Sequence, residues 1–372
     1  MDLNAPGRTL RIGGRPLPVV GPARMYVCGI TPYDATHLGH ARSFVWADVA
    51  VRVLRHAGGE VRVCRNVTDV DDVLYQAAAR AGSPYDRFAA VHQFYFERDL
   101  EALCVHAVDH QPRAHTHVRE VIALAQGLLA SGHAYARDGA VYFRGGDVPR
   151  RVGIDDSRAH EMMTEYGDEP GSPGKEHPFD VAVWRPSRSG EPAWPSPWGP
   201  GRPGWHAECA AMAMAMFGPA LDLHSGGTDL RFPHHAYEAA LAEALTGVRP
   251  FSRAWLHVGM VLRDGVKMAK SAGNLVLVSD LVHGHPAAAV RLMLISAPWR
   301  DDWDYAPASL DAAAARLDAL RAAAGRPASS AAAEAAATRA LLDDLDVPAA
   351  LSIAEEEGGG TARMVMRVLA LG

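Results

Sequence analysis

The order of apolar and polar residues along the chain predicts strands and helices in alternation. Residues 25–27 form a short apolar strand signal that ends at Gly29 and Pro32. An apolar run with helical spacing follows over 44–54, and 60–67 has the composition of a second strand. Strand, helix and strand in this order predict a βαβ unit, and therefore a parallel sheet with a right-handed crossover.

The pattern beyond residue 67 predicts more helices, separated by an irregular stretch. Helical spacing covers 75–81, 88–103, 118–131 and 205–216, and short strands are expected at 140–143, 221–223 and 255–261. Residues 144–204 are dense in Gly, Pro and charge, so we expect long loops there. From residue 286 onward the chain is predicted to be helical, with 324–335 as an Ala/Ser linker.

Composition narrows the class of protein. Hydrophobic residues make up 48% and charged residues 22% of the 372 residues, as in a soluble globular protein. The net charge of −6 argues against a broadly basic nucleic-acid surface. No apolar run has membrane-spanning length, and the first residues lack the apolar segment of a signal peptide. Four scattered cysteines do not make a disulfide framework, so we expect a cytoplasmic protein with reduced thiols.

The first candidate site lies in residues 25–41. The tetrad at 37–40, His-Leu-Gly-His, is placed where the loop after the first strand enters a helix. Backbone N–H groups at a helix N-terminus attract anions, and two imidazoles there can donate hydrogen bonds to phosphate oxygens. Because ligands bind at the C-terminal ends of parallel strands, one crevice should collect five side chains: Cys28, Thr31, His37, His40 and Thr68.

An acidic run follows the second strand. Asp69, Asp71 and Asp72 suggest either a magnesium site or a helix N-cap with acidic first-turn residues. We favour the cap, because one acidic loop does not make a metal site.

Two short motifs carry a resemblance when they are taken together. His37-Leu38-Gly39-His40 resembles the HIGH signature of class I aminoacyl-tRNA synthetases, and Lys267-Met268-Ala269-Lys270-Ser271 resembles their KMSKS signature. Each motif alone is weakly specific, whereas both in this order and at this separation are strongly specific. The surrounding residues, CGITPYDATHLGHA, are similar to the cysteine-specific branch, which contains cysteinyl-tRNA synthetase and the cysteine ligase of mycothiol biosynthesis.

This resemblance covers about residues 25–305 and implies a fold. The expected architecture is a Rossmann-type (HUP, class I synthetase) α/β catalytic domain with a parallel sheet. Residues 1–120 and 201–285 are expected to form its two halves, the second with a zinc site and the KMSKS-like loop. Residues 121–200 would be an inserted connective region, and 286–372 a helical C-terminal domain like a stem-contact domain.

A metal site is implied by the same resemblance. His234 and Glu238 have the i, i+4 spacing that places both on one helix face. Thiolates and imidazoles suit Zn²⁺, but buried cysteines often act only as small hydrophobes, so the residues alone leave both interpretations open. The resemblance implies zinc, because four positions match the ligands of cysteinyl-tRNA synthetase: Cys28, Cys209, His234 and Glu238. Glu238 is left as a fourth or an outer ligand, and Cys64 and Cys104 are expected in the core.

Roles in the formation of an adenylate are implied as well. His37, His40, Lys267 and Lys270 would stabilise phosphate charge as pyrophosphate leaves, with Mg²⁺ accompanying ATP. Nucleotide contacts are expected from Gly39, Gly227, Asp229 and Ser271, and cysteine contacts from Thr31, Thr68 and Trp205. Asp229 fits the N-cap of a following helix equally well. Ala269 departs from the serine of KMSKS but leaves both lysines, so we expect activity with weaker control of the loop.

The acceptor of the activated cysteine is the main question that the sequence raises. A tRNA synthetase should carry an anticodon-recognition domain, whereas this chain ends about 100 residues after Lys270 with an acidic tail. Residues 28–41 are closer to the mycothiol ligase, so we expect a monomer that joins cysteine to the amine of glucosaminyl-inositol. Glu238 matches the tRNA synthetases and Ala236 matches neither branch. A cysteinyl-tRNA synthetase or a paralogue with another amine acceptor therefore stays open, while a non-catalytic homologue is disfavoured by the intact motifs.

Overall fold

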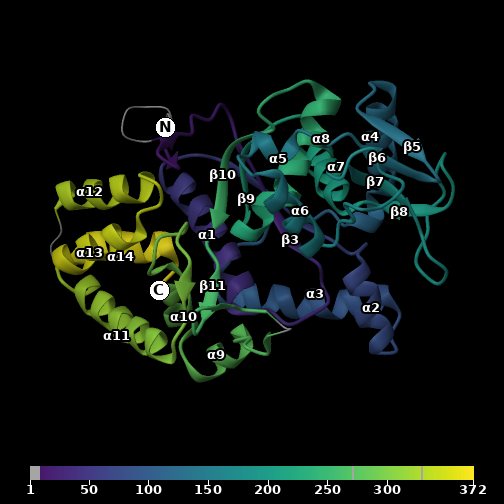
Figure 1. The fold of residues 1–372 in the computed structure, drawn as a ribbon. Helices are drawn as coiled ribbons and strands as arrows, with labels where there is room; N and C mark the ends of the chain where they lie inside the picture. Colours follow the sequence, from purple (N-terminus) through teal and green to yellow (C-terminus); the bar gives the residue numbers. More distant parts are fainter. Residues whose placement is uncertain (1–8, 270–271, 328–329) are drawn as a thin grey trace.

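A parallel four-stranded sheet forms the centre of the computed structural model, which describes residues 9–269, 272–327 and 330–372 (Figure 1). Its strands are adjacent in the order β10-β9-β3-β4. The bounds are β3 Ala23–Ile30, β4 Val61–Val67, β9 Leu221–Gly227 and β10 Ser252–Val258. All three pairings are parallel, and Met25 lies opposite Val63 on one side and Leu223 on the other. The predicted βαβ unit and parallel sheet are confirmed.

Helices cover both faces of this sheet, so its strands are buried on both sides. Helix α1 (Leu38–His56) packs with Val27, Leu223 and Leu256 in the largest apolar core. Tyr26, which alternates with Met25 and Val27 along β3, belongs to a second core that includes Met212 of α7. Helices α7 (Trp205–Phe217) and α8 (Ala236–Thr246) lie on that side, whereas α3 (Tyr85–Ala102) contributes Phe96 and Leu100 to the core of α1. Helix α2 (Asp72–Arg80) follows β4 at the end of the sheet. A Cβ atom at Gly29 would come within 1.6 Å of the Asn66 oxygen, so only glycine fits where β3 ends against β4.

The segment between the two halves of the sheet forms a second, antiparallel sheet in the order β5-β6-β7-β8. Its elements are α4 (Val118–Ala130), β5 (Ala134–Arg137), β6 (Ala140–Phe143), α5 (Val148–Arg151), α6 (Asp156–Glu165), β7 (Val181–Pro186) and β8 (Gly201–Pro203). The expectation of long loops over 144–204 was therefore wrong in part. Val181, Val183 and Trp184 are fully buried against α4 and α7, and this packing outweighs the unfavourable local composition.

The C-terminal part is mainly helical, as predicted, and lies on the other side of the central sheet from the antiparallel sheet in Figure 1. A small sheet precedes it, with β11 (Val261–Arg263) between β12 (Val266–Lys267) and β13 (Trp303–Asp304). The helices are α9 (Val278–Gly284), α10 (Ala287–Ile295), α11 (Pro307–Ala324), α12 (Ala331–Leu342), α13 (Val347–Glu357) and α14 (Gly359–Leu369). Helix α12 begins inside the predicted linker, whose alanines favour a helix. An N-terminal hairpin, β1 (Arg11–Ile12) with β2 (Arg15–Pro16), contacts Asp343. Within the described residues, none of the helices is long and apolar enough to cross a membrane.

A buried ion pair joins the central sheet domain to these helices. Arg291 of α10 is fully buried and donates to Asp48 Oδ2 of α1 at 2.5 Å, and to the backbone oxygens of Leu103 and Leu369. Burial alone would raise the pKa of Asp48, but the hydrogen bond with His106 and the charge of Arg291 hold it well below its ordinary range. The carboxylate is thus charged at neutral pH, and it also contacts Arg52 Nε at 2.6 Å and His106 Nδ1 at 2.8 Å.

We expect the variant Asp48→Ala to lower the free energy of unfolding by about 3–5 kcal/mol, because it leaves a buried guanidinium without its counter-charge. Urea denaturation measures this loss. In the double variant Asp48→Leu/Arg291→Met most of the stability should return, since two apolar groups can replace a buried pair with little net cost. A double variant as unstable as the single one would contradict this account.

Candidate active site

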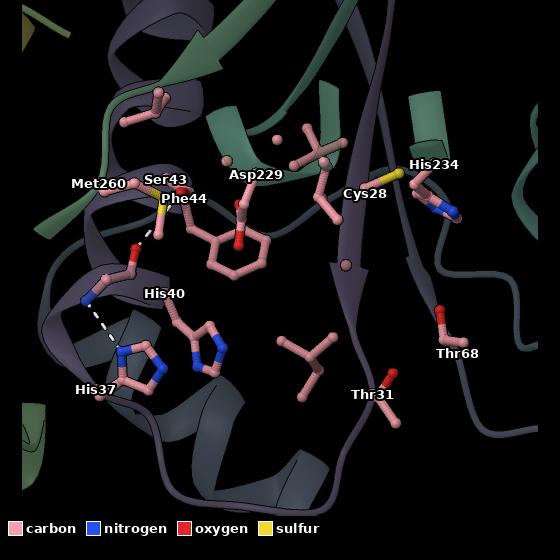
Figure 2. A pocket seen from close by; sticks show the side chains of 18 of the residues that line it. Cys28, Thr31, His37, His40, Ser43, Phe44, Thr68, Asp229, His234 and Met260 are labelled. Carbon is pink, nitrogen blue, oxygen red and sulfur yellow. Dashed lines mark hydrogen bonds between the residues drawn. The ribbon is translucent and has the colours of Figure 1, made fainter. Parts of the chain in front are cut away.

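A cavity of about 310 Å³ lies at the C-terminal ends of β3, β4 and β9 (Figure 2), and we call it the main cavity. It brings together most of the residues that the sequence suggested: Cys28, Thr31, His37, Gly39, His40, Thr68, Trp205, Cys209, Gly227, Asp229, His234 and Lys267. Glu238 is fully buried next to Cys28 and His234. Lys270 and Ser271 lie outside the described residues. Figure 2 shows the histidines 37 and 40 on one side of the cavity, and Cys28 with His234 on the other.

Both histidines of the first motif lie at the start of α1. His37 is the N-cap residue, and its Nδ1 accepts a hydrogen bond from the Gly39 amide at 3.1 Å. Nδ1 therefore carries no proton, which leaves Nε2–H of His37 as a donor toward the cavity. Burial and the charge of His40 lower the pKa of His37 to about 3, and burial lowers that of His40 to about 4. Both rings are neutral at pH 7, and they stack with 3.8 Å between their centroids.

Lys267 lies opposite these histidines and is held in place by an acidic partner. Its Nζ donates to Asp229 Oδ2 at 3.2 Å and lies 5.8 Å from the ring centroid of Tyr166. Burial alone would lower the pKa of Lys267, but the charge of Asp229 raises it, so the ammonium stays charged. Asp229 follows β9 and caps no helix, so the N-cap interpretation of this residue was wrong. Asp71, by contrast, does cap α2, since its side chain accepts from the Val73 amide.

A buried arginine fixes the distance between the two motifs. Arg42 lies one turn after the histidine motif and is fully buried. Its guanidinium donates to the backbone oxygens of Gly259 (3.0 Å), Pro298 (2.9 Å) and Asp301 (2.8 Å). Gly259 lies just before β11, and β12 after it carries Lys267. Arg42 therefore connects the start of α1 to the strands of the second motif.

Four buried side chains offer metal-ligand atoms at the other side of the main cavity. The ligand atoms of Cys28, Cys209, His234 and Glu238 all lie within 4.8 Å of one another, and we call these residues the four-residue cluster. The Glu238 carboxylate pairs with His234 Nε2 at 2.7 Å and with His224 Nε2 at 2.8 Å. It also accepts a hydrogen bond from the Cys28 thiol at 3.2 Å. Burial alone would raise the pKa of Glu238, but His234 and His224 hold it well below its ordinary range.

Charge is shared within the four-residue cluster. The hydrogen bond with Cys28 lowers the pKa of Cys209 to about 6, whereas burial raises that of Cys28. Burial opposes protonation of His234, but the charges of Glu238 and Cys209 raise its pKa to about 10. A thiolate and a carboxylate thus lie together in an apolar setting, which is a donor set that fits a soft divalent cation such as Zn²⁺.

Outer contacts orient the imidazole of this cluster. His234 Nδ1 lies 3.0 Å from His206 Nδ1, and His206 Nε2 lies 3.1 Å from Asp168 Oδ2. Donation from His234 through His206 to Asp168 satisfies all three groups and leaves His234 Nε2 facing the cluster. Trp205 stacks on His234 with 4.2 Å between the ring centroids. Hydrogen bonding of the outer nitrogen is the usual setting of a metal-binding histidine.

The role of His224 was not predicted from the sequence. This residue forms a second group of possible ligands with Cys28, His235 and Glu238. A polar residue directly after the strand predicted at 221–223 was the available signal, because a histidine inside the buried strand β9 needs a polar partner. Cys64 lies in the core as expected, whereas Cys104 is exposed just after α3 with a φ of 56°, so that expectation was wrong.

Comparison with known proteins now adds the family. Residues 19–315 match the family described as the catalytic domain of class I (C) tRNA synthetases. The chain belongs to this family. The predicted resemblance and fold class are both confirmed.

Similar curated proteins bear one common name, L-cysteine:1D-myo-inositol 2-amino-2-deoxy-alpha-D-glucopyranoside ligase. The protein of this name from Mycobacterium marinum is 46% identical over 91% of this chain and 84% of its own. That from Rhodococcus erythropolis is 43% identical over 93% of this chain and 88% of its own. Among solved structures, Mycobacterium tuberculosis methionyl-tRNA synthetase bound by methionyl-adenylate matches with a TM-score of 0.66 at 18% identity, over 93% of this chain and 84% of that one, and shows the fold alone.

We expect Arg42→Met to lower the free energy of unfolding by roughly 3 kcal/mol, because the backbone oxygens of Gly259, Pro298 and Asp301 all lose their charged donor. Urea denaturation and limited proteolysis near residue 259 check this result. Arg62→Met removes a guanidinium that is 59% exposed and should change stability by less than about 0.5 kcal/mol. Equal effects of the two substitutions would contradict the role assigned to Arg42.

Proposed function

We propose that this protein uses ATP to activate L-cysteine as cysteinyl-adenylate and transfers the cysteinyl group to the amine of glucosaminyl-inositol, as in mycothiol biosynthesis. The observation that carries the proposal is that one cavity joins the two nucleotide motifs to a thiol- and imidazole-rich cluster. The acceptor is inferred from the relatives' shared name, at 42–46% identity over nine tenths of the chain or more.

The activation step is assigned to positioned charge and hydrogen bonds. A carboxylate oxygen of cysteine attacks the α-phosphorus of ATP, and pyrophosphate leaves with the electrons of the broken P–O bond. His37 and His40, neutral in the cavity, donate Nε2–H to phosphate oxygens, and the Lys267 ammonium offsets the developing negative charge. The KMSKS-like motif assigns the same work to Lys270. No protein nucleophile is required, and Mg²⁺ accompanies ATP.

The nucleotide contacts follow from the same geometry. Gly39 offers its backbone beside the imidazoles, and Gly227 lies next to Asp229. Asp229 is assigned to the ribose hydroxyls, and Ser271 to the phosphates by its motif. Residues 1–120 and 201–285 make up the catalytic domain in this proposal, 121–200 the inserted region and 286–372 the helical domain.

Selection of cysteine is assigned to the four-residue cluster. Cys28, Cys209 and His234 would hold Zn²⁺, with Glu238 as a fourth or an outer ligand. A bound zinc supplies a soft cation that prefers the substrate's thiolate to the hydroxyl of serine, a pair that steric selection separates poorly. Trp205, stacked on His234, walls the substrate side chain, and Thr31 and Thr68 face the same space.

A second candidate acceptor is tRNA. Glu238 favours it, because the carboxylate is shared with cysteinyl-tRNA synthetases and is here part of the four-residue cluster. The acidic C-terminal helices disfavour it, since phosphate contacts supply much of the affinity for nucleic acid.

The identity of the acceptor is tested by incubating the protein with ATP and cysteine, together with either glucosaminyl-inositol or tRNA. The products are then identified by their molecular masses. We expect AMP and a cysteinyl amide of glucosaminyl-inositol, and little charged tRNA.

Lys267→Met should lower kcat of ATP–pyrophosphate exchange by about 10²–10³, as does loss of one preorganised electrostatic donor. Charging of tRNA at rates typical of synthetases would replace the proposed acceptor, and absence of cysteine-dependent exchange would refute the activation step.

Metal analysis of the purified protein tests the four-residue cluster. We expect one zinc per chain, lost in Cys209→Ser because a hydroxyl is a poor ligand for a soft cation. Cys104→Ser changes the same atom at an exposed position and should keep its zinc. Zinc-free wild-type protein, or equal zinc in both variants, would refute the site.

A further inference from the structure

A second, smaller cavity lies beside the main one, and we call it the side cavity. Its volume is about 120 Å³. Six of its side chains matter here: Asp71, Tyr166, Asp168, Arg185, Trp205 and His206. They come from the start of α2, the end of α6, strand β7 and the start of α7, so the antiparallel insertion and the central domain both contribute to it.

The side cavity touches the main cavity at two places. Trp205 lines both cavities and stacks on His234 of the four-residue cluster. Tyr166 lines the side cavity, and its ring lies 5.8 Å from the Lys267 ammonium in the main cavity. One contact is therefore on the side assigned to cysteine and the other on the side assigned to phosphate. The carbonyl of an adenylate joins these two parts, so a nucleophile held in the side cavity is close to the bond that must react.

The charges in the side cavity favour an amine and hydroxyl groups. Asp72 is neutralised by Arg185 at 3.1 Å and Arg202 at 2.6 Å. Among the described residues, Asp71 accepts hydrogen bonds from backbone N–H groups, and Asp168 pairs with His206 through one oxygen and lies near the charges of Lys175 and Arg185. Each of these two carboxylates therefore keeps an oxygen that can accept hydrogen bonds from a ligand.

A buried carboxyl next to this cavity supports the same preference. Glu208 is 1% exposed, and within the described residues neither of its oxygens has a hydrogen-bond partner. A buried polar group without a partner is uncommon and calls for an explanation. A ligand amine that donates hydrogen bonds beside Asp71 would add a donor to this carboxyl-rich region.

We propose that the side cavity is the acceptor subsite and binds the amino-sugar ring of an amine acceptor. Asp71 accepts hydrogen bonds from the amine, and Asp168 accepts them from ring hydroxyls. A buried water needs about 10–15 Å³ of such volume, so the cavity has room for roughly ten waters, close to the size of one sugar ring. The second ring of a pseudodisaccharide extends beyond it. This inference rests on the proposed function and adds where the acceptor binds.

The test uses two variants of the full-length protein and two acceptors, glucosaminyl-inositol and methyl α-D-glucosaminide. Asp71→Asn removes the charge but preserves the helix cap, because asparagine caps as well as aspartate. We expect the acceptor KM to rise about tenfold or more for both acceptors, the loss of one hydrogen bond to a charged group. Cysteine-dependent ATP–pyrophosphate exchange should stay within about twofold, because activation precedes acceptor binding. Asp86→Asn, the same change on an exposed residue, serves as the matched control.

Ala182→Leu tests the cavity without a change of charge. Ala182 lines the side cavity, so a larger side chain should exclude the sugar ring and lower kcat/KM for both acceptors, with exchange retained. If wild-type protein ligates the acceptors and both variants keep the wild-type KM, the subsite is refuted while the proposed function stands. If wild-type protein exchanges pyrophosphate but ligates neither acceptor, the proposed function and the subsite fail together.

Discussion

A fully buried carboxylate, that of Glu238, sets the conditions that the centre of this protein has to meet. An isolated charge in an apolar interior is very costly, so it persists only with counter-charges and hydrogen bonds around it. His224 of β9, His234 before α8 and Cys28 of β3 supply them. Satisfying one carboxylate therefore brings two strands and a helix to the same point, which is the C-terminal edge of the sheet where the main cavity opens. A metal ion would meet the same electrostatic need with the same donors.

Helix α1 transmits this local order to the rest of the chain. The imidazoles of His37 and His40 at its start face the cavity. Further along the helix, Arg42 binds backbone carbonyls next to β11, and Asp48 binds Arg291. Three buried polar contacts on one rigid helix thus relate the first motif, the strands of Lys267 and the C-terminal helices. Buried polar contacts of this kind tolerate little displacement, because a buried donor or acceptor left without its hydrogen bond costs about 1–3 kcal/mol.

Sequence reasoning succeeded where local pattern and final structure agree. The strand at 25–27, the helix after His37 and the cap at Asp71 are each determined by neighbours a few residues away. It failed where distant packing decides. β7 forms because β6, α4 and α7 bury its apolar residues, although its flanks are dense in Gly and Pro. His224 and the pairing of Asp229 with Lys267 were missed for the same reason, since each depends on a partner 14 or more positions away.

Different elements carry the groups assigned to cysteine activation and those assigned to acceptor binding. This separation explains how such a fold can change its acceptor and still activate cysteine. The groups assigned to ATP and cysteine sit on strand ends, on α1 and on α7 and α8, and they are fixed by buried contacts. Tyr166, Asp168 and Arg185 come from the insertion, whose apolar core it shares with α7 and α8. Its polar contacts with the catalytic region, among those described above, are the approach of Tyr166 to Lys267 and the His206–Asp168 pair. Changes in the insertion can therefore alter the shape and charge of the side cavity while the Glu238 network stays satisfied. Because the side cavity is lined largely by side chains outside the Glu238 network, a small polyol amine and a nucleic acid can be alternative acceptors for one activation chemistry.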